Sequence, residues 1–182
     1  MADSSITKMA MANSLKSLMQ EKNFHKISIN DICVGCNMNR KSFYYHFKDK
    51  YDLLNWIFDT EFEGIKIVGA KASLSDLCYF LYNNRDFYRK AFLVEGQNSF
   101  REHLYNYLYE ALSVELNKTL ENDDFEKMQI QFITDGLMCA LMRWITNPDC
   151  IPVDKYLEKM RFLLFHLLNV INNKSKNMSE EL

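Results

Sequence analysis

The chain has 182 residues with a net charge of −2, and 48% of the residues are apolar. Its length suits one large or two small helical domains, and five glycines and two prolines are too few for the tight turns of a sheet protein. The sequence shows no secretory signal and no apolar run of the roughly 20 residues that span a membrane. Its five cysteines lie among apolar neighbours, which suits a reducing cytosol. The sequence therefore favours a cytoplasmic protein with no membrane segment.

The first predicted helix has one apolar face. Its members follow the i, i+3, i+4, i+7 spacing: Met11, Ser14, Leu15, Leu18 and Met19. Ser4 or Ser5 is positioned to cap the start of this helix. Asn23 is expected to end it in the left-handed conformation that asparagine tolerates.

Two short helices are predicted next, joined by a tight turn. Ser28 and Asp31 have the spacing of a capping box, so they are expected to start the second helix. Asn37 tolerates a positive φ in the turn, and Asn39 is expected to cap the third helix. In that helix Phe43 and Phe47 face inward, and the outward residues are Arg40, Lys41, Ser42, Tyr44, Tyr45 and His46.

The rest of the chain continues the helical pattern. Asp49 caps a fourth helix that is expected to run to about residue 68, and further helices are predicted at about 74–83, 86–94, 98–118, 123–147 and 153–172. The prediction is an all-α fold of about nine helices. It comprises a three-helix DNA-binding domain over 1–50, a regulatory and dimerisation domain over 51–172, and a frayed tail over 173–182.

The second and third helices have the features of a helix-turn-helix. Two short helices, a tight turn and a polar, aromatic outer face on the second of them suit insertion into the major groove of double-stranded DNA. Residues 1–50 carry a net charge of +4, whereas the remainder carries −6. A basic head on an acidic body indicates that only the head meets a polyanion.

Residues 27–33 and 37–50 strongly resemble the DNA-binding domain of TetR-type regulators, and the resemblance extends over roughly residues 5–58. Its most specific part is the aromatic-aromatic-His-Phe-x-x-Lys-x-x-Leu-Leu string from Tyr44 to Leu54. The sequence departs from the family at Asn37, where glycine is usual, and at Cys33 and Cys36, where alanine is usual.

The resemblance implies which residues approach DNA. Lys50 resembles the family's phosphate-binding lysine, at a helix start that itself favours an anion. The full set of expected DNA-binding residues is Ser28, Asn30, Arg40, Lys41, Ser42, Tyr44, Tyr45, His46 and Lys50. Residues 51–57, 87–92 and 96–100 resemble a subgroup that includes activators of dihydroxyacetone kinase operons in Gram-positive bacteria. The sign of regulation stays open, as repressor or activator.

Other functions are less consistent with the sequence. Cys33 and Cys36 form a Cys-x-x-Cys pair, but no second ligand pair accompanies it and both lie on an apolar stripe, which favours core packing over zinc binding or redox chemistry. We expect no metal and no cofactor. His46 lacks a catalytic partner, and no nucleophile–base pair or carboxylate cluster indicates an enzyme. A helical adaptor without DNA binding is the alternative, and the intact Arg40–Lys41 start disfavours it.

The last two predicted helices are apolar nearly all round, which predicts a homodimer built from two helices of each subunit. The expected interface residues are Gly136, Ala140, Met160, Leu164, Leu167 and Ile171. Asp135 and Arg143 share a face and form either interface ion pairs or part of a ligand pocket. A pocket for a small-molecule effector, or alternatively a coactivator protein, is expected on this domain. The candidate pocket residues are Trp56, Tyr107, Arg143 and Trp144.

Overall fold

The computed structural model describes residues 2–63, 73–116 and 124–163, and every regular element in these ranges is a helix. The predicted all-helical class is therefore confirmed for the described part of the chain. The elements are α1 (Ala2–Glu21), the 3₁₀ helix η1 (Phe24–Lys26), α2 (Ile29–Gly35), α3 (Arg40–His46), α4 (Lys50–Glu63), α5 (Leu74–Asn83), α6 (Arg85–Ala91), α7 (Phe100–Leu116), α8 (Asp124–Thr146) and a helix over 153–163.

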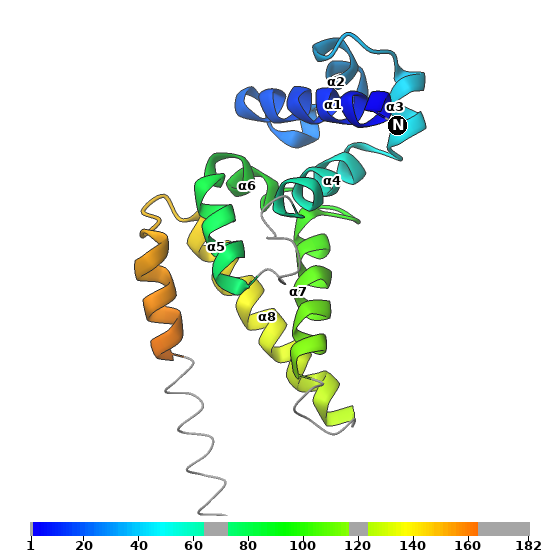
Figure 1. Ribbon diagram of the computed structural model, residues 1–182. Helices are drawn as coiled ribbons and strands as arrows, with labels where there is room; N and C mark the ends of the chain where they lie inside the picture. Colours follow the sequence, from blue (N-terminus) through cyan, green and yellow to red (C-terminus); the bar gives the residue numbers. More distant parts are fainter. Residues whose placement is uncertain (1, 64–72, 117–123, 164–182) are drawn as a thin grey trace, which may run out of the picture.

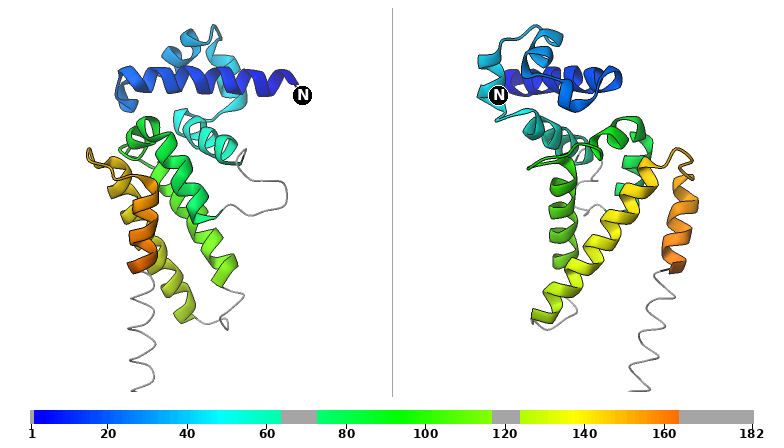
Figure 2. Two further views of the ribbon diagram at one scale, coloured as in Figure 1. Left: turned by 60° about the vertical axis from the view of Figure 1, so that its left-hand side comes forward. Right: turned by 180° about the vertical axis from the view of Figure 1, so that it is seen from behind.

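The helices form a head, made of α1, α2 and α3, and a body, made of α5 to α8 and the helix over 153–163, with α4 between them. Figure 1 shows α1, α2 and α3 gathered at one end of the molecule, with α4 leading from this head to the helices that follow. The two long helices α7 and α8 run through the body and pack on each other, and the views of Figure 2 agree on this arrangement. The predicted helix-turn-helix of α2 and α3 therefore lies at one end of the molecule.

The core of the head combines side chains from α1 to α4. The predicted face of α1 is buried, with Met11, Leu15 and Met19 at most 1% exposed. Ile32 of α2 and Phe43 of α3 pack into the same core and are fully buried. Because α2 and α3 have seven residues each, most of their stability comes from this tertiary packing.

The predicted start and stop signals in the motif are confirmed. Ser28 and Asp31 form a complete capping box at α2, and the Asn39 side chain accepts from the Ser42 amide at the start of α3. Asp49 accepts from the amides of Tyr51 and Asp52 at the start of α4. Asn37 has a φ of 55°, the left-handed conformation expected for the turn.

Two predictions at the ends of α1 are wrong. The helix begins at Ala2, so Ser4 and Ser5 lie inside it and do not cap it. Asn23 has φ −64° and ψ 139°, an extended conformation, and its side chain accepts from the His25 amide. The chain leaves α1 by entering η1 rather than by a left-handed residue, so Asn23 caps the start of η1.

The body has a core of stacked and edge-on aromatic rings. Phe58 of α4 contacts the rings of Phe62, Phe80 and Phe100 at centroid distances of 5.4 to 5.9 Å. Fully buried Tyr88 of α6 packs against the Phe80 and Phe100 rings. The core thus joins α4, which carries the head, to α5, α6 and α7.

The helix over 153–163 is attached to α8 by an aromatic stack. The Trp144 ring lies parallel to the Tyr156 ring at 4.0 Å and to the Tyr82 ring at 5.7 Å. Trp144 Nε1 donates to the Ile151 carbonyl at 2.8 Å, and the Tyr79 hydroxyl donates to Asp154. Predicted helical segments at 64–68 and 164–172, and the tail over 173–182, lie outside the described residues. The proposed domain boundary at residue 50 stays a prediction.

The crossing of α1 and α2 depends on Gly35, the last residue of α2. A Cβ added at Gly35 would lie 2.3 Å from Ser14 Oγ. The Ser14 hydroxyl is buried and donates to the Ile32 carbonyl at 2.8 Å, so the added carbon would displace this bond. A side chain at position 35 therefore requires the Ser14 hydroxyl to move and give up its hydrogen bond, or α2 to shift relative to α1.

Gly35→Ala is expected to lower the free energy of unfolding by about 1 kcal/mol, because an overpacking cost of about 1–3 kcal/mol exceeds the gain in helix propensity. Chemical denaturation measures this change. In a Ser14→Ala background, which removes the clashing oxygen, the added cost of Gly35→Ala should fall to near zero. An equal cost in both backgrounds would contradict the contact.

Candidate DNA-binding site

Helix α3 presents a polar and aromatic face to solvent. Arg40 and Lys41 in its first turn are exposed, and Ser42 is half-buried. The Tyr45 side chain is 82% exposed and Tyr44 is 50% exposed. Because Phe43 and Phe47 hold the opposite face in the core, these side chains are presented by a helix whose orientation is fixed by packing.

Contacts among the exposed side chains of α3 restrain their conformations. Arg40 donates to the Tyr44 hydroxyl at 3.4 Å, and its guanidinium lies 5.9 Å from the centre of the Tyr44 ring. The rings of Tyr45 and half-buried His46 meet edge-on at 4.8 Å. These side chains offer donors suited to guanine acceptors and to phosphate oxygens.

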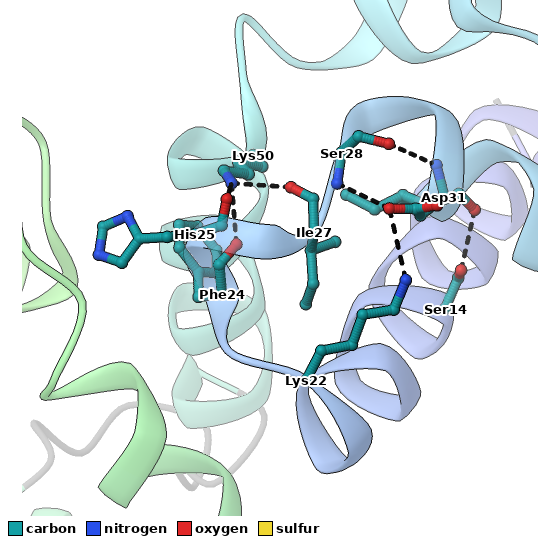
Figure 3. A network of polar contacts seen from close by, with 9 residues as sticks. Ser14, Lys22, Phe24, His25, Ile27, Ser28, Asp31 and Lys50 are labelled. Carbon is teal, nitrogen blue, oxygen red and sulfur yellow. Dashed lines mark hydrogen bonds and ion pairs between the residues drawn. The ribbon is translucent and has the colours of Figure 1, made fainter.

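Polar contacts among Ser28, Asp31 and Lys22 hold the start of α2. Ser28 and Asn30 are both exposed, although the Ser28 hydroxyl already accepts from the Asp31 amide at 3.1 Å. The hydrogen bonds from Ser28 to the Asp31 carboxylate lower the pKa of Asp31, and the Lys22 ammonium lies 3.5 Å from the same carboxylate (Figure 3).

Lys50 occupies a different environment from the exposed lysines. Its Nζ donates to the carbonyls of Ile27 at 2.7 Å, Phe24 at 2.8 Å and His25 at 3.4 Å (Figure 3). The ammonium also lies 4.6 Å from the centre of the Phe24 ring. Partial burial lowers the pKa of Lys50.

Several polar contacts join the head to the body. Lys90 of α6 donates to the carbonyls of Met19 and Gln20, at the C-terminal end of α1, at 2.7 and 2.8 Å. Tyr51 of α4 donates to the Glu95 carbonyl at 3.2 Å, and Asn55 donates to the Asn98 carbonyl at 3.1 Å. Lys90 was not predictable as a connecting residue, because its partners lie 70 and 71 residues away along the chain.

The four candidate pocket residues are in separate surroundings. Trp56 of α4 packs against the Phe47 ring, at a centroid distance of 5.7 Å. Tyr107 of α7 packs edge-on against Phe58 and Phe62. Trp144 belongs to the aromatic stack on α8, whereas Arg143 is exposed. The described contacts thus place Trp56, Tyr107 and Trp144 on three different helices, α4, α7 and α8, with separate ring partners.

The cysteine pair has the surroundings of core residues. Cys33 is 2% exposed, and Cys36 Sγ points to the Ile32 carbonyl at 3.2 Å. Burial raises the pKa of both thiols, which suppresses thiolate formation. Over the ranges that the structure describes, no group of three His, Cys, Asp or Glu side chains is placed to hold a metal ion. Within the same ranges, no helix is long and apolar enough to cross a membrane.

An exposed polar helix, held at the end of the molecule by a second short helix and a left-handed turn, defines a helix-turn-helix DNA-binding protein. Comparison with known proteins specifies the class further. Residues 15–57 match the model of bacterial regulatory proteins of the tetR family, and residues 70–166 match a transcriptional regulator C-terminal region.

One relative is the HTH-type dhaKLM operon transcriptional activator DhaS of Lactococcus lactis subsp. lactis (strain IL1403). It is 30% identical over 79% of this chain and 81% of its own length. Two solved structures share the fold. The dihydroxyacetone kinase operon activator DhaS has a TM-score of 0.61 at 23% identity, over 91% of this chain and 97% of that one. A TetR transcriptional regulator from Streptococcus agalactiae 2603V has a TM-score of 0.66 at 22% identity, over 87% and 93%.

The chain belongs to the TetR family of transcriptional regulators, and its N-terminal helix-turn-helix is the family's DNA-binding domain. The sequence resemblance is thereby confirmed, including its C-terminal part. The roles of individual DNA-binding residues stay predictions, and the family consists of regulators rather than enzymes.

Asn39→Ala removes the side-chain acceptor at the start of α3, so it should lower the free energy of unfolding by about 1 kcal/mol. Thermal or chemical unfolding without DNA measures this change. Asn39→Ser, which keeps a capping oxygen, is the matched control and should stay near wild type. Equal destabilisation by both variants would contradict the capping role.

Proposed function

We propose that the protein acts as a cytoplasmic homodimer that binds a near-palindromic operator with one α3 helix from each subunit. The observation that carries this proposal is the exposed polar face of α3, fixed by buried Phe43 and Phe47. In such dimers the two recognition helices enter successive major grooves, about 34–36 Å apart. Selection of bound duplexes from a random pool tests the proposal, and the enriched sequences should contain two inverted half-sites.

The outer surface of α8 supports the dimer. Phe132 is 78% exposed and Met128 is 60% exposed, and both lie on a helix whose opposite side is packed in the body. A Cβ added at Gly136 would meet no atom within 4 Å. Apolar side chains around an open glycine favour close approach of a second helix, and large exposed apolar patches mark protein interfaces.

The helix over 153–163 also exposes apolar side chains. Phe162 is 67% exposed and Leu163 is 50% exposed, while half-buried Met160 contacts the core. Ala140 of α8 is also half-buried. Leu164, Leu167 and Ile171, the other expected interface residues, lie outside the described residues. We propose that the two subunits pair through α8 and this last helix.

We propose direct DNA contacts for the exposed residues of the motif. Arg40 and Lys41 in the first turn of α3 are placed to reach base edges, because recognition helices read bases from their N-terminal ends. Tyr45, with 82% of its side chain exposed, is suited to a base or phosphate contact. The remaining proposed contacts are Ser28, Asn30, Ser42, Tyr44 and His46.

Regulation is proposed to act through the joints between body and head. Lys90 and Tyr51 connect the two parts through backbone carbonyls, and His103 of α7 lies 2.7 Å from Asp59 of α4. A small-molecule effector or a coactivator protein bound to the body would change DNA affinity only through its preference for one arrangement of these joints.

We propose that the protein is an activator, since the relative of 30% identity is named as an operon activator. Deletion of the gene decides the sign of regulation. Transcription of the target operon should fall in the deletion strain and return when the gene is restored. A rise in transcription would identify a repressor and contradict this part of the proposal, without affecting DNA binding.

Arg40→Ala should relax base preference at one position of each half-site, at a cost of about 1–3 kcal/mol for the preferred base. Affinities for a set of single-base operator variants measure this effect. Arg89→Ala, which removes an exposed arginine of α6 in the body, is the control and should keep the wild-type preference. An unchanged preference in Arg40→Ala would remove Arg40 from base recognition.

Gly136→Arg should convert the dimer to a monomer, because it places a long charged side chain on the proposed contact surface. Sedimentation at micromolar concentration measures the oligomeric state, and operator affinity should fall with dimer loss. Gln97→Arg adds the same charge in the exposed α6–α7 connection and should remain dimeric. A dimeric Gly136→Arg protein would place the interface elsewhere.

A further inference from the structure

An open cleft lies between the head and the body, where the end of α1 meets α6 (Figure 1). Its volume is about 340 Å³, within the range of small-molecule sites. One wall is formed by residues 20–24, at the end of α1 and the start of η1, and the other by residues 89, 90, 93 and 94, in and after the last turn of α6. None of the four candidate pocket residues lines this α1–α6 cleft.

The charged groups of the α1–α6 cleft are mainly cationic. Lys22 contributes from the head, and Arg89 and Lys90 contribute from the body. Glu21 is the acid among the described lining residues, so three cations and one acid give the lining a net charge of +2. Lys22 shares its charge with Asp31 at 3.5 Å, which leaves the two α6 side chains as the principal anion binders.

Both α6 cations have donors available for a ligand. The exposed Arg89 guanidinium has no hydrogen bond or ion pair to another described residue. Lys90 donates to the carbonyls of Met19 and Gln20 at 2.7 and 2.8 Å, which leaves the third of its N–H groups. An arginine fork binds two oxygens of one phosphate, so adjacent arginine and lysine side chains suit a phosphate group.

The α1–α6 cleft also has an apolar side. The Leu93 side chain, directly after α6, is 64% exposed. Buried Phe24 and Val94 complete this side. A phosphate monoester carries a charge of about −1.5 to −2 near pH 7, which matches the cationic lining, and its organic group would contact the leucine. Inorganic phosphate has no group that uses the apolar side.

We propose that the α1–α6 cleft binds a small phosphate monoester, with Arg89 and Lys90 on the phosphate and Leu93 on the organic group, and that the bound ligand changes how the body holds the head. The inference deepens the proposed function by naming an effector class and its site, and only its effect on DNA rests on that function. Because Lys90 also binds the end of α1, the phosphate competes with the two α1 carbonyls for its ammonium. Occupancy of the cleft is thereby coupled to the joint between α6 and α1.

Calorimetric titration of the full chain without DNA tests the site, with phenyl phosphate and inorganic phosphate as probes. Phenyl phosphate should bind the wild-type protein at millimolar concentration or below. Arg89→Ala should weaken this binding about tenfold or more, because hydrogen bonds between charged groups are lost. Lys155→Ala, which removes an exposed cation of the helix over 153–163, is the matched control and should bind as wild type. Undetectable binding by the wild-type protein would overturn the inference.

Two further variants locate the probe. Leu93→Ala should remove the preference of the wild-type protein for phenyl phosphate over inorganic phosphate, because that preference comes from apolar contact. Lys41→Ala, on the exposed face of α3, should leave the affinity for both probes unchanged. Loss of binding in Lys41→Ala with retention in Arg89→Ala would place the phosphate on the DNA-binding face and overturn the inference.

The effect on DNA is measured with a duplex selected from a random pool by the wild-type protein. Saturating phenyl phosphate should change the duplex affinity of the wild-type protein by about fivefold or more, relative to NaCl of the same ionic strength. Arg89→Ala should show no such change, and an equal change in both proteins would overturn the coupling. Absence of duplex binding by the wild-type protein at low salt would instead overturn the proposed function and leave the phosphate site standing.

Discussion

The DNA-binding motif depends on the burial of a few apolar side chains against the longer helices on either side of it. Helices of seven residues are marginal in water, so α2 and α3 need the burial of Ile32 and Phe43 in the core that they share with α1 and α4. The same packing leaves one face of α3 free for DNA. A glycine at position 35 lets α2 approach α1 closely enough for this core to form, because Ser14 occupies the space that a side chain would need.

Backbone carbonyls accept several of the hydrogen bonds between the head and the body. Lys90 donates to carbonyls at the end of α1, and Tyr51 donates to a carbonyl of the α6–α7 connection, so these bonds have peptide groups as acceptors. Such bonds depend on the position of the backbone. A small shift of α6 relative to α1 would alter them directly, which is the basis of the regulation proposed above.

Local signals in the sequence were sufficient to predict the motif. The capping box of Ser28, the cap at Asn39 and the left-handed turn at Asn37 each involve residues within four positions, and the structure has all three. Long-range contacts were not predictable in the same way. The partners of Lys50 and Lys90 lie at least 23 residues away. The surroundings of the candidate pocket residues were likewise not predictable, since the Trp144 ring stacks on Tyr82 and Tyr156 from other helices. The pocket itself stays a prediction.

The chain has two tryptophans, and the fold places them in different parts of the molecule. Trp56 lies beneath the head, where its ring contacts Phe47 and the Lys8 ammonium, whereas Trp144 is stacked between two tyrosines at the joint between α8 and the helix over 153–163. Native fluorescence therefore contains two separable signals. Replacing one indole leaves an intrinsic optical reporter of the other region, so that occupancy of DNA and rearrangement near the proposed subunit contact are observable in solution without an attached dye.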